Sequence, residues 1–547
     1  MPGLPDLLFP DIDREPEYYE ARYPARGLPD GAMVTRLGPS PTGFIHLGNL
    51  YMAFANERLA RQSGGVFFLR IEDTDDRREV EGAAQAVIGS LGHYGIGFDE
   101  GPLPGGETGA YGPYRQSLRG EIYRCFARKL LAEGKAYPCF LTEGEIGGIR
   151  ARQEAAKLTP GIYGEWAVCR DLPPEEAARR VRGGEPWALR FRADGGAGGH
   201  VSVQDGIRGR LSMPKNAMDV VLLKANGMPT YHFAHVVDDR LMRATHVIRG
   251  EEWLSSLPIH IALFEALGWT PPTYCHTAVL MKLDGGAKRK LSKRKDPELS
   301  LDYYMSEGYH PAAMREYMLT IMNSNFEEWR LANPLSPIGE FGFSIEKMGN
   351  SGMLFDLDKL RDVSRERLLT IPARELAEFM ADWAERAAPD AARLMRSDMG
   401  SLERMLDIGR GGEKPRKDLA YAAQILGHIG YFYDELFRIE DEWPESVPRE
   451  DIAPLLLGYL EGYRHGDGRD DWFGRLRALA EENGYAAKPK DFRKSPRLYR
   501  GHVGDVSAVI RIALTGRRNS PDLWDIQQIL GEARTRARIA AAAERAR

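Results

Sequence analysis

The sequence is poor in cysteine, in long apolar runs and in net charge of either sign. Four of its 547 residues are cysteine, too few in a chain of this length for a disulfide framework. We find no run of about 18 apolar residues, which a membrane-spanning helix requires. The formal net charge of -5, from 74 basic and 79 acidic side chains, argues against a surface coated with basic residues for nucleic acid. These absences predict a reduced, soluble, cytoplasmic protein that binds any polyanion through local patches.

The sequence does contain enough material for several folded domains. At about 150 residues per domain, its length predicts three or four of them. Hydrophobic residues make up 43% and aromatic residues 10% of the chain, which suits ordinary buried cores. The N-terminal segment carries prolines and acidic side chains where a signal peptide would need basic residues and then an apolar stretch. We therefore expect residues 1–30 to be an extension wrapped on a later domain.

Strand and helix signals alternate along the first third of the chain. Residues 33–37 form an apolar strand pattern, 38–43 are turn residues, and 47–59 place apolar side chains on one helical face. A second strand pattern at 66–71 completes a strand–helix–strand unit, which implies parallel strands. The strand signal resumes at 219–223 and 245–249, after a helix-rich stretch. The predicted fold is α/β: a doubly wound parallel, Rossmann-type domain with an α/β insertion, followed by a mainly α-helical C-terminal region.

The turn at 39–49 lies where a strand gives way to a helix. The first turn of a helix offers unpaired backbone N–H groups and the positive end of the helix dipole, which suits a phosphate. Gly48 has no Cβ, so a ligand can approach the backbone closely, and His46 would donate to a developing phosphate charge. The alternative is a tight turn that carries a surface histidine.

A basic segment at 288–295 is a second candidate for phosphate binding. Six of its eight side chains are cationic, and a flexible Gly285-Gly286 pair precedes it. A mobile cationic loop can clamp a triphosphate and follow the charge as pyrophosphate leaves. The alternative is a solvated loop or a nonspecific polyanion patch.

Together these segments resemble the two signatures of class I aminoacyl-tRNA synthetases. His46-Leu47-Gly48-Asn49 is similar to the family's His-Ile-Gly-His, and Lys-Leu-Ser-Lys-Arg at 290–294 is similar to its Lys-Met-Ser-Lys-Ser. Further stretches resemble, in order along the chain, the bacterial type of glutamyl-tRNA synthetase: 39–43, 69–75, 112–117, 229–234, 236–239 and 247–253. The sequence is therefore identified as a member of that family.

The resemblance implies a ligation in two steps. Such enzymes join L-glutamate to ATP, supplied with Mg2+, giving glutamyl-adenylate and pyrophosphate. They then transfer the glutamyl group to the 3'-terminal adenosine of tRNA(Glu). The nucleophiles belong to the substrates, so the protein supplies positioning and charge stabilisation and needs no covalent residue. We expect a monomer with no membrane partner.

The family's site residues map onto this sequence one by one. For ATP the resemblance assigns His46, Gly48, Asn49, Glu252, Lys290 and Lys293. The expected catalytic residues among them are His46, Lys290 and Lys293. For glutamate it assigns Arg36, Ser40, Glu72, Tyr231, His235 and Arg249. The two guanidinium groups suit carboxylates, and Glu72 suits the ammonium; the alternative for Arg36 and Arg249 is a structural salt bridge.

The same resemblance divides the chain after the extension. The expected segments are a Rossmann catalytic domain in two halves, an inserted tRNA acceptor-binding domain, a connecting stem-contact region with the basic loop, and a helical anticodon-binding region. The two catalytic halves span 31–114 and 191–290, and the inserted domain spans 115–190. The connecting region spans 291–365, and the anticodon-binding region spans 366–547. In the last region, cations at 416–417 and 488–500 lie near aromatic residues such as Tyr431, Phe432 and Tyr499, which favours single-stranded RNA.

The sequence departs from the family where some relatives bind zinc. Those relatives carry a Cys-x-Cys pair followed by Tyr and Cys. Here Cys139 is followed by Leu141 in place of the second thiol. Tyr163 and Cys169 remain downstream. Two thiols and a phenol are a poor set for tetrahedral zinc, so we do not expect zinc.

Two further departures concern specificity. His235 stands where relatives often have Asn in the amino-acid pocket. By our register, Gly430 stands where discriminating relatives carry an arginine that reads the third anticodon base. The hypothesis is that tRNA(Gln) is also charged with glutamate; the alternative is a misplaced register.

Two other functions fit parts of the sequence. A paralogue that glutamylates a tRNA base usually lacks the anticodon domain, and the long helical C-terminal half argues against it. A catalytically inactive tRNA-binding paralogue is disfavoured by intact His46, Lys290 and Lys293.

Overall fold

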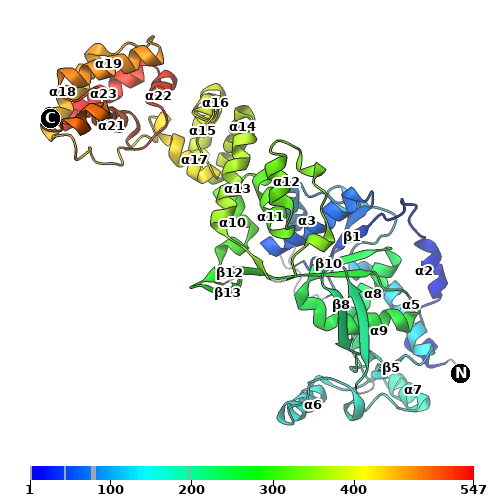
Figure 1. The fold of residues 1–547 in the computed structure, drawn as a ribbon. Coiled ribbons are helices and arrows are strands. Elements are labelled where there is room, and N and C mark those ends of the chain that lie inside the picture. Colours follow the sequence, from blue (N-terminus) through cyan, green and yellow to red (C-terminus); the bar gives the residue numbers. More distant parts are fainter. Residues whose placement is uncertain (1–2, 42–44, 75–81, 195–197, 293, 351) are drawn as a thin grey trace. The chain divides into compact units, whose positions relative to one another are not determined.

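The computed structural model describes residues 3–41, 45–74, 82–194, 198–292, 294–350 and 352–547. The chain divides into two compact units (Figure 1). The first consists of Met1–Leu301 and Arg315–Asp356, and the second of Asp302–Met314 and Leu357–Arg547.

Two pairs of parallel strands form the centre of the first unit. β1 (Val34–Leu37) pairs with β2 (Val66–Leu69), and β10 (His246–Gly250) pairs with β11 (Thr273–Thr277). A 2.9 Å backbone hydrogen bond from Thr245 N to Val34 O links the two pairs. Every residue of β1 is buried, as expected where helices cover both faces of a parallel sheet. The predicted doubly wound α/β arrangement is confirmed.

Helices connect the parallel strands and cover them. α3 (Leu47–Gln62) joins β1 to β2, and α9 (Leu257–Leu267) joins β10 to β11. Figure 1 draws α3 above the strands and α8 (Tyr231–Leu241) with α9 below them. Ile261 of α9 packs against Val247 and Tyr274 of the strands, and burying such a side chain contributes about 1.5–3 kcal/mol.

The chain between the two parallel pairs builds a separate antiparallel sheet. β5 (Ala136–Cys139), β6 (Ala188–Phe191) and β9 (Val221–Leu223) pair in that order. The strand expected at 219–223 therefore forms, but it pairs with β6 rather than with the parallel strands. The other elements of this stretch are α4 (Ala83–His93), β3 (Gly101–Leu103), β4 (Gly106–Thr108), α5 (Gly120–Ala132), α6 (Glu143–Ala155), α7 (Pro174–Arg182), β7 (His200–Asp205) and β8 (Gly209–Pro214).

The N-terminal segment packs against α5. It contains two short helices, α1 (Leu4–Leu8) and α2 (Pro16–Arg22). The Tyr19 hydroxyl donates to Glu121 of α5 at 2.7 Å, and Tyr23 donates to the Gly112 carbonyl at 2.7 Å. Arg26 forms a bidentate pair with Glu100, with distances of 2.7 and 2.9 Å. These contacts tie residues 3–26 to the surface of the first unit.

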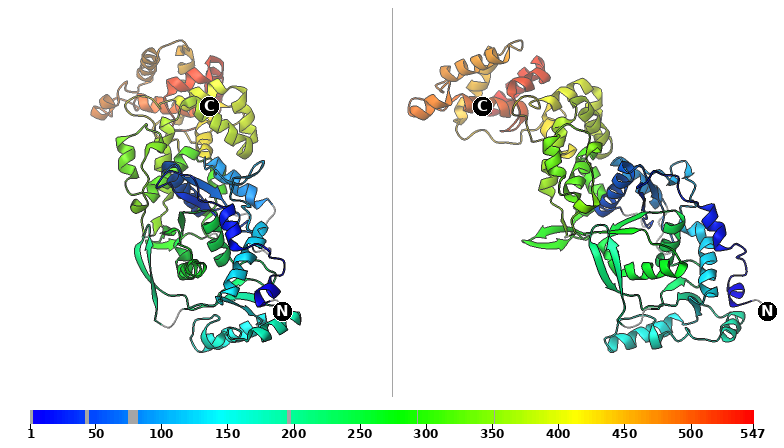
Figure 2. Two further views of the ribbon diagram at one scale, coloured as in Figure 1. Left: turned by 90° about the vertical axis from the view of Figure 1, so that its right-hand side faces the viewer. Right: turned by 45° about the vertical axis from the view of Figure 1, so that its right-hand side comes forward.

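The last part of the first unit carries a hairpin that leads into the basic segment. β12 (Leu280–Asp284) and β13 (Ala287–Lys290) are antiparallel, and β14 (Met353–Leu354) pairs with β12. Figures 1 and 2 show this hairpin extending away from the parallel strands. The helices of the surrounding chain are α10 (Leu301–Glu307), α11 (Pro311–Met322) and α12 (Phe326–Ala332).

The second unit is helical, as predicted for the C-terminal region. Its helices are α13 (Leu357–Thr370), α14 (Ala373–Ala387), α15 (Pro389–Ser397), α16 (Met399–Asp407), α17 (Ala422–Ile429), α18 (Arg449–Gly462), α19 (Arg469–Glu482), α20 (Pro489–Lys494), α21 (Val503–Thr515), α22 (Leu523–Leu530) and α23 (Glu532–Ala546). A continuous apolar core includes Leu376, Ile425, Leu456 and Ile539. Within the described ranges, no helix combines the length and apolar character needed to cross a bilayer.

Gly516 ends α21 in a conformation that only glycine adopts easily. Its φ is +74°, and a Cβ at this position would lie 1.9 Å from the Arg438 carbonyl oxygen. Gly268, which ends α9, has a similar left-handed backbone, with φ +75° and ψ +26° against +74° and +3° at Gly516, but a Cβ there would meet nothing within 4 Å. The two glycines therefore separate the cost of the left-handed backbone from the cost of a steric clash.

We predict that Gly516→Ala destabilises the second unit far more than Gly268→Ala destabilises the first. Strain plus overpacking should lower the free energy of unfolding by about 3 kcal/mol at Gly516, and strain alone by about 1 kcal/mol at Gly268. Urea unfolding followed by tryptophan fluorescence measures both. Equal losses in the two variants would contradict the packing at Gly516.

Candidate functional site

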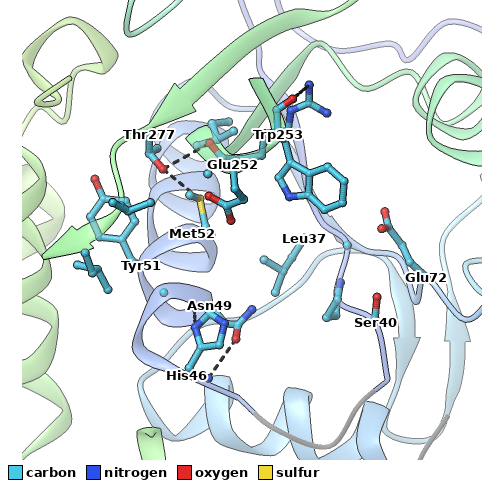
Figure 3. Close-up of a pocket in the computed structure, with 18 of the residues that line it drawn as sticks. Leu37, Ser40, His46, Asn49, Tyr51, Met52, Glu72, Glu252, Trp253 and Thr277 are labelled. Atoms are coloured by element: carbon cyan, nitrogen blue, oxygen red, sulfur yellow. Dashed lines mark hydrogen bonds between the residues drawn. The ribbon is translucent and has the colours of Figure 1, made fainter. Parts of the chain in front are cut away.

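A cavity of about 570 Å³ lies at the carboxyl ends of β1, β10 and β11 (Figure 3). Ligands of open α/β sheets bind at this edge. The sequence-predicted residues that line it are Arg36, Ser40, His46, Gly48, Asn49, Glu72, Tyr231, Arg249, Glu252 and Lys290. Lys293, and residues 42–44 of the predicted turn, lie outside the described residues.

His46 begins α3 and forms one edge of the cavity. Its Nδ1 accepts from the Asn49 backbone N–H at 3.3 Å, while the Asn49 side chain accepts from the His46 N–H at 3.0 Å. A neutral ring that accepts at Nδ1 carries its proton on Nε2. A Cβ on Gly48 would lie 3.0 Å from the imidazole, so glycine leaves the ring room over the first helical turn. The result is a helix N-terminus and a ring N–H at one cavity wall, which suits a phosphate.

Buried arginines and carboxylates form the floor of the cavity. Arg70 pairs with Asp239 at 2.5 Å and with Glu72 at 2.9 Å. Arg36 lies 3.3 Å from Asp239. Burial raises the pKa of Glu72, although Arg70 and Arg36 oppose it. Burial would also raise the pKa of Asp239, but Arg36 and Arg70 lower it overall.

Arg249 is buried without a carboxylate partner. Its side chain donates from Nε to His276 Nε2 at 2.9 Å, and one terminal nitrogen lies 3.1 Å from His260 Nδ1. The other terminal nitrogen donates to the Trp253 carbonyl at 3.4 Å. Among the described residues, no acidic side chain forms a salt bridge with Arg249, which is only 5% exposed. A buried cation without a counter-charge is costly, so the cavity demands an anion here.

Aromatic side chains surround the remaining wall. The Tyr231 ring lies 4.4 Å from the Trp253 ring, measured between centroids, and burial raises the pKa of Tyr231. His235 is fully buried behind this wall and does not line the cavity. Its Nε2 pairs with the Tyr274 hydroxyl at 2.9 Å, and its Nδ1 lies 3.1 Å from Asp239. Burial lowers the pKa of His235 well below its usual value, so the ring is neutral.

The basic segment is tied to an internal carboxylate. Arg289 donates to both oxygens of Asp296, at 2.7 and 2.8 Å, and the Ser292 N–H donates to Asp296 at 2.8 Å. Arg289 also pairs with the exposed Asp284 at 2.6 Å. The Arg289 guanidinium holds the pKa of Asp296 well below its usual range. Arg289 therefore holds the conformation of the segment through Asp296, while Lys290 lines the cavity.

Several lining residues were missed by sequence reasoning. Gln116, Trp253 and Thr277 belong to this group. Gln116 Nε2 donates to Asp238 at 2.9 Å, and the Thr277 hydroxyl donates to the Arg249 carbonyl at 3.4 Å. Gln116 and Trp253 lie within the stretches that resemble the family, so the resemblance could have identified them as site residues.

The cysteines at the expected departure from the zinc pattern lie together. The Phe140 N–H donates to the Cys169 sulfur at 3.5 Å, beside Cys139, and both thiols are buried. Tyr163 instead donates to the Thr159 carbonyl at 2.8 Å. In the part of the chain that the structure describes, no three Cys, His, Asp or Glu side chains gather as metal ligands. The expectation of no zinc stays a prediction.

In the second unit, the aromatic residues and the cations predicted to bind RNA do not form one surface. Tyr431 and Phe432 are buried in the helical core and cannot stack on a base. Arg416 and Lys417 pair with Asp418 and Glu366. An exposed set without ion pairs among the described residues remains around α20: Lys488, Lys490, Arg493, Lys494 and Arg497. This segment is the better candidate for a phosphate backbone.

Comparisons with known proteins found relatives over the whole length of the chain. Residues 32–360 match a family model described as "tRNA synthetases class I (E and Q), catalytic domain", and residues 501–543 match an anticodon binding domain. A glutamate–tRNA ligase of Acetivibrio thermocellus is 58% identical over 537 residues, covering 98% of each chain. One from Clostridium perfringens is 47% identical over 542 residues, covering 98% of this chain and 99% of the relative. A crystal structure of a glutamate tRNA ligase from Elizabethkingia meningosepticum in complex with its amino acid has a TM-score of 0.73 and 26% identity, covering 94% of this chain and 99% of that one.

We predict that Asp296→Ala loosens the basic segment. Without its buried anchor, the segment should open more often, and trypsin should cleave within 288–295 about tenfold faster, since loss of a charge-assisted bond costs about 1.5–3 kcal/mol. Asp284→Ala is the matched control, because it removes only the exposed partner of Arg289. Cleavage rates from mass spectrometry that do not differ between the variants would refute the anchor.

Proposed function

This chain belongs to the class I tRNA synthetases of the glutamate and glutamine type, and we propose that it ligates L-glutamate to tRNA(Glu) at the cavity of the first unit. Full-length similarity to glutamate–tRNA ligases supports this activity. The observation that carries the choice of substrate is the buried, unneutralised guanidinium of Arg249. It calls for a carboxylate, and the cavity places it across from a helix N-terminus suited to phosphate.

The reaction needs two substitutions and no covalent protein residue. First, an oxygen of the glutamate α-carboxylate attacks the α-phosphorus of ATP, and the bond to pyrophosphate breaks. Second, a ribose hydroxyl of the terminal tRNA adenosine attacks the glutamyl carbonyl, and AMP leaves with the bonding electrons. Both steps depend on alignment and on stabilising charge as it develops. Mg2+ enters with ATP, because magnesium is held largely by phosphates and water.

We assign the nucleotide to the α3 end of the cavity. His46, Gly48 and Asn49 form the helix start, and His46 would donate to a phosphate oxygen. Lys290 and Lys293 would follow the charge that moves onto pyrophosphate, since a lysine is a point charge on a flexible stem. Glu252 would contact the nucleoside from the segment after β10.

We assign glutamate to the opposite end. Arg36 and Arg249 would receive its two carboxylates, and Glu72 would receive the ammonium. Ser40 and Tyr231 would complete the contacts, whereas His235 would act from behind the wall through its contacts with Arg36 and Asp239. Glutamine would be rejected because a neutral amide leaves a buried cation uncompensated.

The remaining parts of the chain are proposed to hold the tRNA. Residues 115–190 would bind the acceptor end, 291–365 the stem, and 366–547 the anticodon arm, with 31–114 and 191–290 as the catalytic halves. The unpaired cations at 488–497 support the last assignment. We further propose a cytoplasmic monomer.

Two alternative functions are not favoured. A tRNA-base glutamylating paralogue would not share the full length of glutamate–tRNA ligases with their anticodon-binding segment. A catalytically inactive tRNA-binding paralogue would not be expected to retain His46 and Lys290 at the same cavity.

Relaxed choice of tRNA is the finer proposal. Gly430 follows α17 and lines a cavity of about 500 Å³ together with Arg438 and Arg517. A Cβ on Gly430 would have only Leu436 nearby, at 3.9 Å, so the glycine is not required by packing. We propose that the absence of a side chain here lets tRNA(Gln) be charged with glutamate as well.

We predict that the purified chain charges tRNA(Glu) with glutamate and that Lys293→Ala lowers kcat about 100-fold or more, the usual effect of losing one preorganised donor. The KM for glutamate should change little, since the lysine acts on the moving phosphate charge. Lys288→Ala is the control, because its exposed side chain precedes the signature on β13 and does not line the cavity. Wild-type inactivity with glutamate would refute the function, and normal turnover of Lys293→Ala would refute the role of this lysine.

We predict that Gly430→Arg suppresses charging of tRNA(Gln) by about tenfold or more while charging of tRNA(Glu) is retained, because a guanidinium that hydrogen-bonds to one base edge discriminates against the wrong base by about 1–3 kcal/mol. Gly427→Arg is the matched control, since Gly427 lines the same cavity and also has space around it. Aminoacylation with each purified tRNA measures both. No charging of tRNA(Gln) by the wild type would end the proposal.

A further inference from the structure

Arg249 is oriented by histidines on two different elements. In the parallel pairing of β10 and β11, Arg249 lies directly opposite His276. Its Nε donates to His276 Nε2 at 2.9 Å. From the other side, His260 of α9 places Nδ1 at 3.1 Å from a terminal nitrogen of the guanidinium. The Tyr274 ring lies beneath the guanidinium carbon at 4.7 Å. His276 and His260, which are both buried, thus accept from two different nitrogens of the Arg249 guanidinium.

Asp205 sets the tautomer of His276. It lies at the end of β7, is fully buried, and approaches His276 Nδ1 at 2.6 Å. The Ile207 and Arg208 backbone N–H groups also donate to Asp205, at 2.9 Å each. Burial opposes ionisation of Asp205, but the hydrogen bonds from His276 and the backbone lower its pKa overall. The carboxylate therefore accepts the Nδ1 proton, and the Nε2 lone pair faces Arg249.

His260 is oriented in the same way by a further histidine. Its Nε2 lies 3.0 Å from His232 Nδ1. Because His260 Nδ1 faces a guanidinium that can only donate, His260 carries its proton on Nε2 and donates it to His232. Burial lowers the pKa of His260 well below its usual value and lowers that of His276. Both rings next to Arg249 are therefore neutral acceptors.

We propose that His276 and His260 are positioning residues that aim the Arg249 guanidinium at a substrate carboxylate while leaving its positive charge unneutralised. This inference rests on the proposed use of Arg249 for glutamate. Arg249 differs in this respect from Arg36 and Arg70 of the cavity floor, because Asp239 contacts both of those arginines directly. A carboxylate in the place of His276 would hold Arg249 equally well but would cancel the charge that draws the substrate. The imidazole of His276 instead lies between Arg249 and the Asp205 carboxylate, so the two charges are not in direct contact.

The test uses side chains of one size that differ in charge. His276→Gln offers a neutral oxygen near the position of Nε2, His276→Glu offers an anionic one, and His276→Leu offers none. The measurement is the KM for glutamate and for ATP in pyrophosphate exchange with tRNA(Glu) present, together with the melting temperature. We expect the Glu and Leu variants to raise the glutamate KM about tenfold or more, equivalent to about 1.4 kcal/mol. The Gln variant should stay within about threefold, and the ATP KM should change little in all three, because the affected contact is to glutamate.

His246→Gln is the matched control, since His246 lies on β10, the strand that carries Arg249, and contacts Thr245 rather than Arg249. Should a His276 variant fail to fold, His260→Asn and His260→Asp repeat the comparison on α9. Equal glutamate KM values in the Gln and Glu variants, or a parallel rise in the ATP KM, would overturn the proposal. Wild-type enzyme that does not charge glutamate would instead refute the proposed function.

Discussion

Compensation of buried charge is the constraint on which the cavity depends. Arg70 and Arg119 are fully buried, and Asp238 and Asp239 on α8 lie between them. Desolvating an ion costs several kcal/mol unless partners replace the lost water. Asp238 accepts from Arg119 at 2.7 Å and from the Tyr123 hydroxyl at 2.8 Å, so it fixes α5 and α8 together. The ion pairs of Asp238 and Asp239 with Arg119 and Arg70 therefore connect α5 and α8 to the floor of the site.

Compensation of charge is incomplete at Arg249. Arg36 and Arg70 share the Asp239 carboxylate, whereas Arg249 is surrounded by neutral histidines and an aromatic ring. The first arrangement balances the charges of the floor, and the second leaves a cation to which we propose that a substrate carboxylate binds. Because the α3 N-terminus forms another wall, the cavity can hold a carboxylate and a phosphate in fixed relation. An amino-acid carboxylate activated by ATP needs that relation.

Local sequence predicted the parts of the site that are contiguous in the chain. A strand, a glycine turn and a helix start are short-range patterns, so the surroundings of His46 followed from residues 33–59. The helical character of the C-terminal half was equally local. The exposure of individual side chains was not: Tyr431 and Phe432 were expected near RNA, but helix packing buries them. The strand at 219–223 also forms as expected, but it pairs with β6. Strand partners are set by contacts between distant parts of the chain, which local patterns do not encode.

The family, the parallel α/β plan and a set of site residues, most of which line the cavity, were predictable from the amino-acid sequence alone, because they follow from ordered motifs and local periodicity. The three-dimensional packing was needed to show that Arg36 and Arg70 have a carboxylate partner and that Arg249 has histidine partners instead. Asp205, His260 and His276 come from β7, α9 and β11, and carry no motif that links them to Arg249. A shift of one residue between β10 and β11 would face Arg249 with Cys275 or Thr277 instead of His276. Strand register and burial, which no local pattern encodes, therefore set the electrostatics of the site.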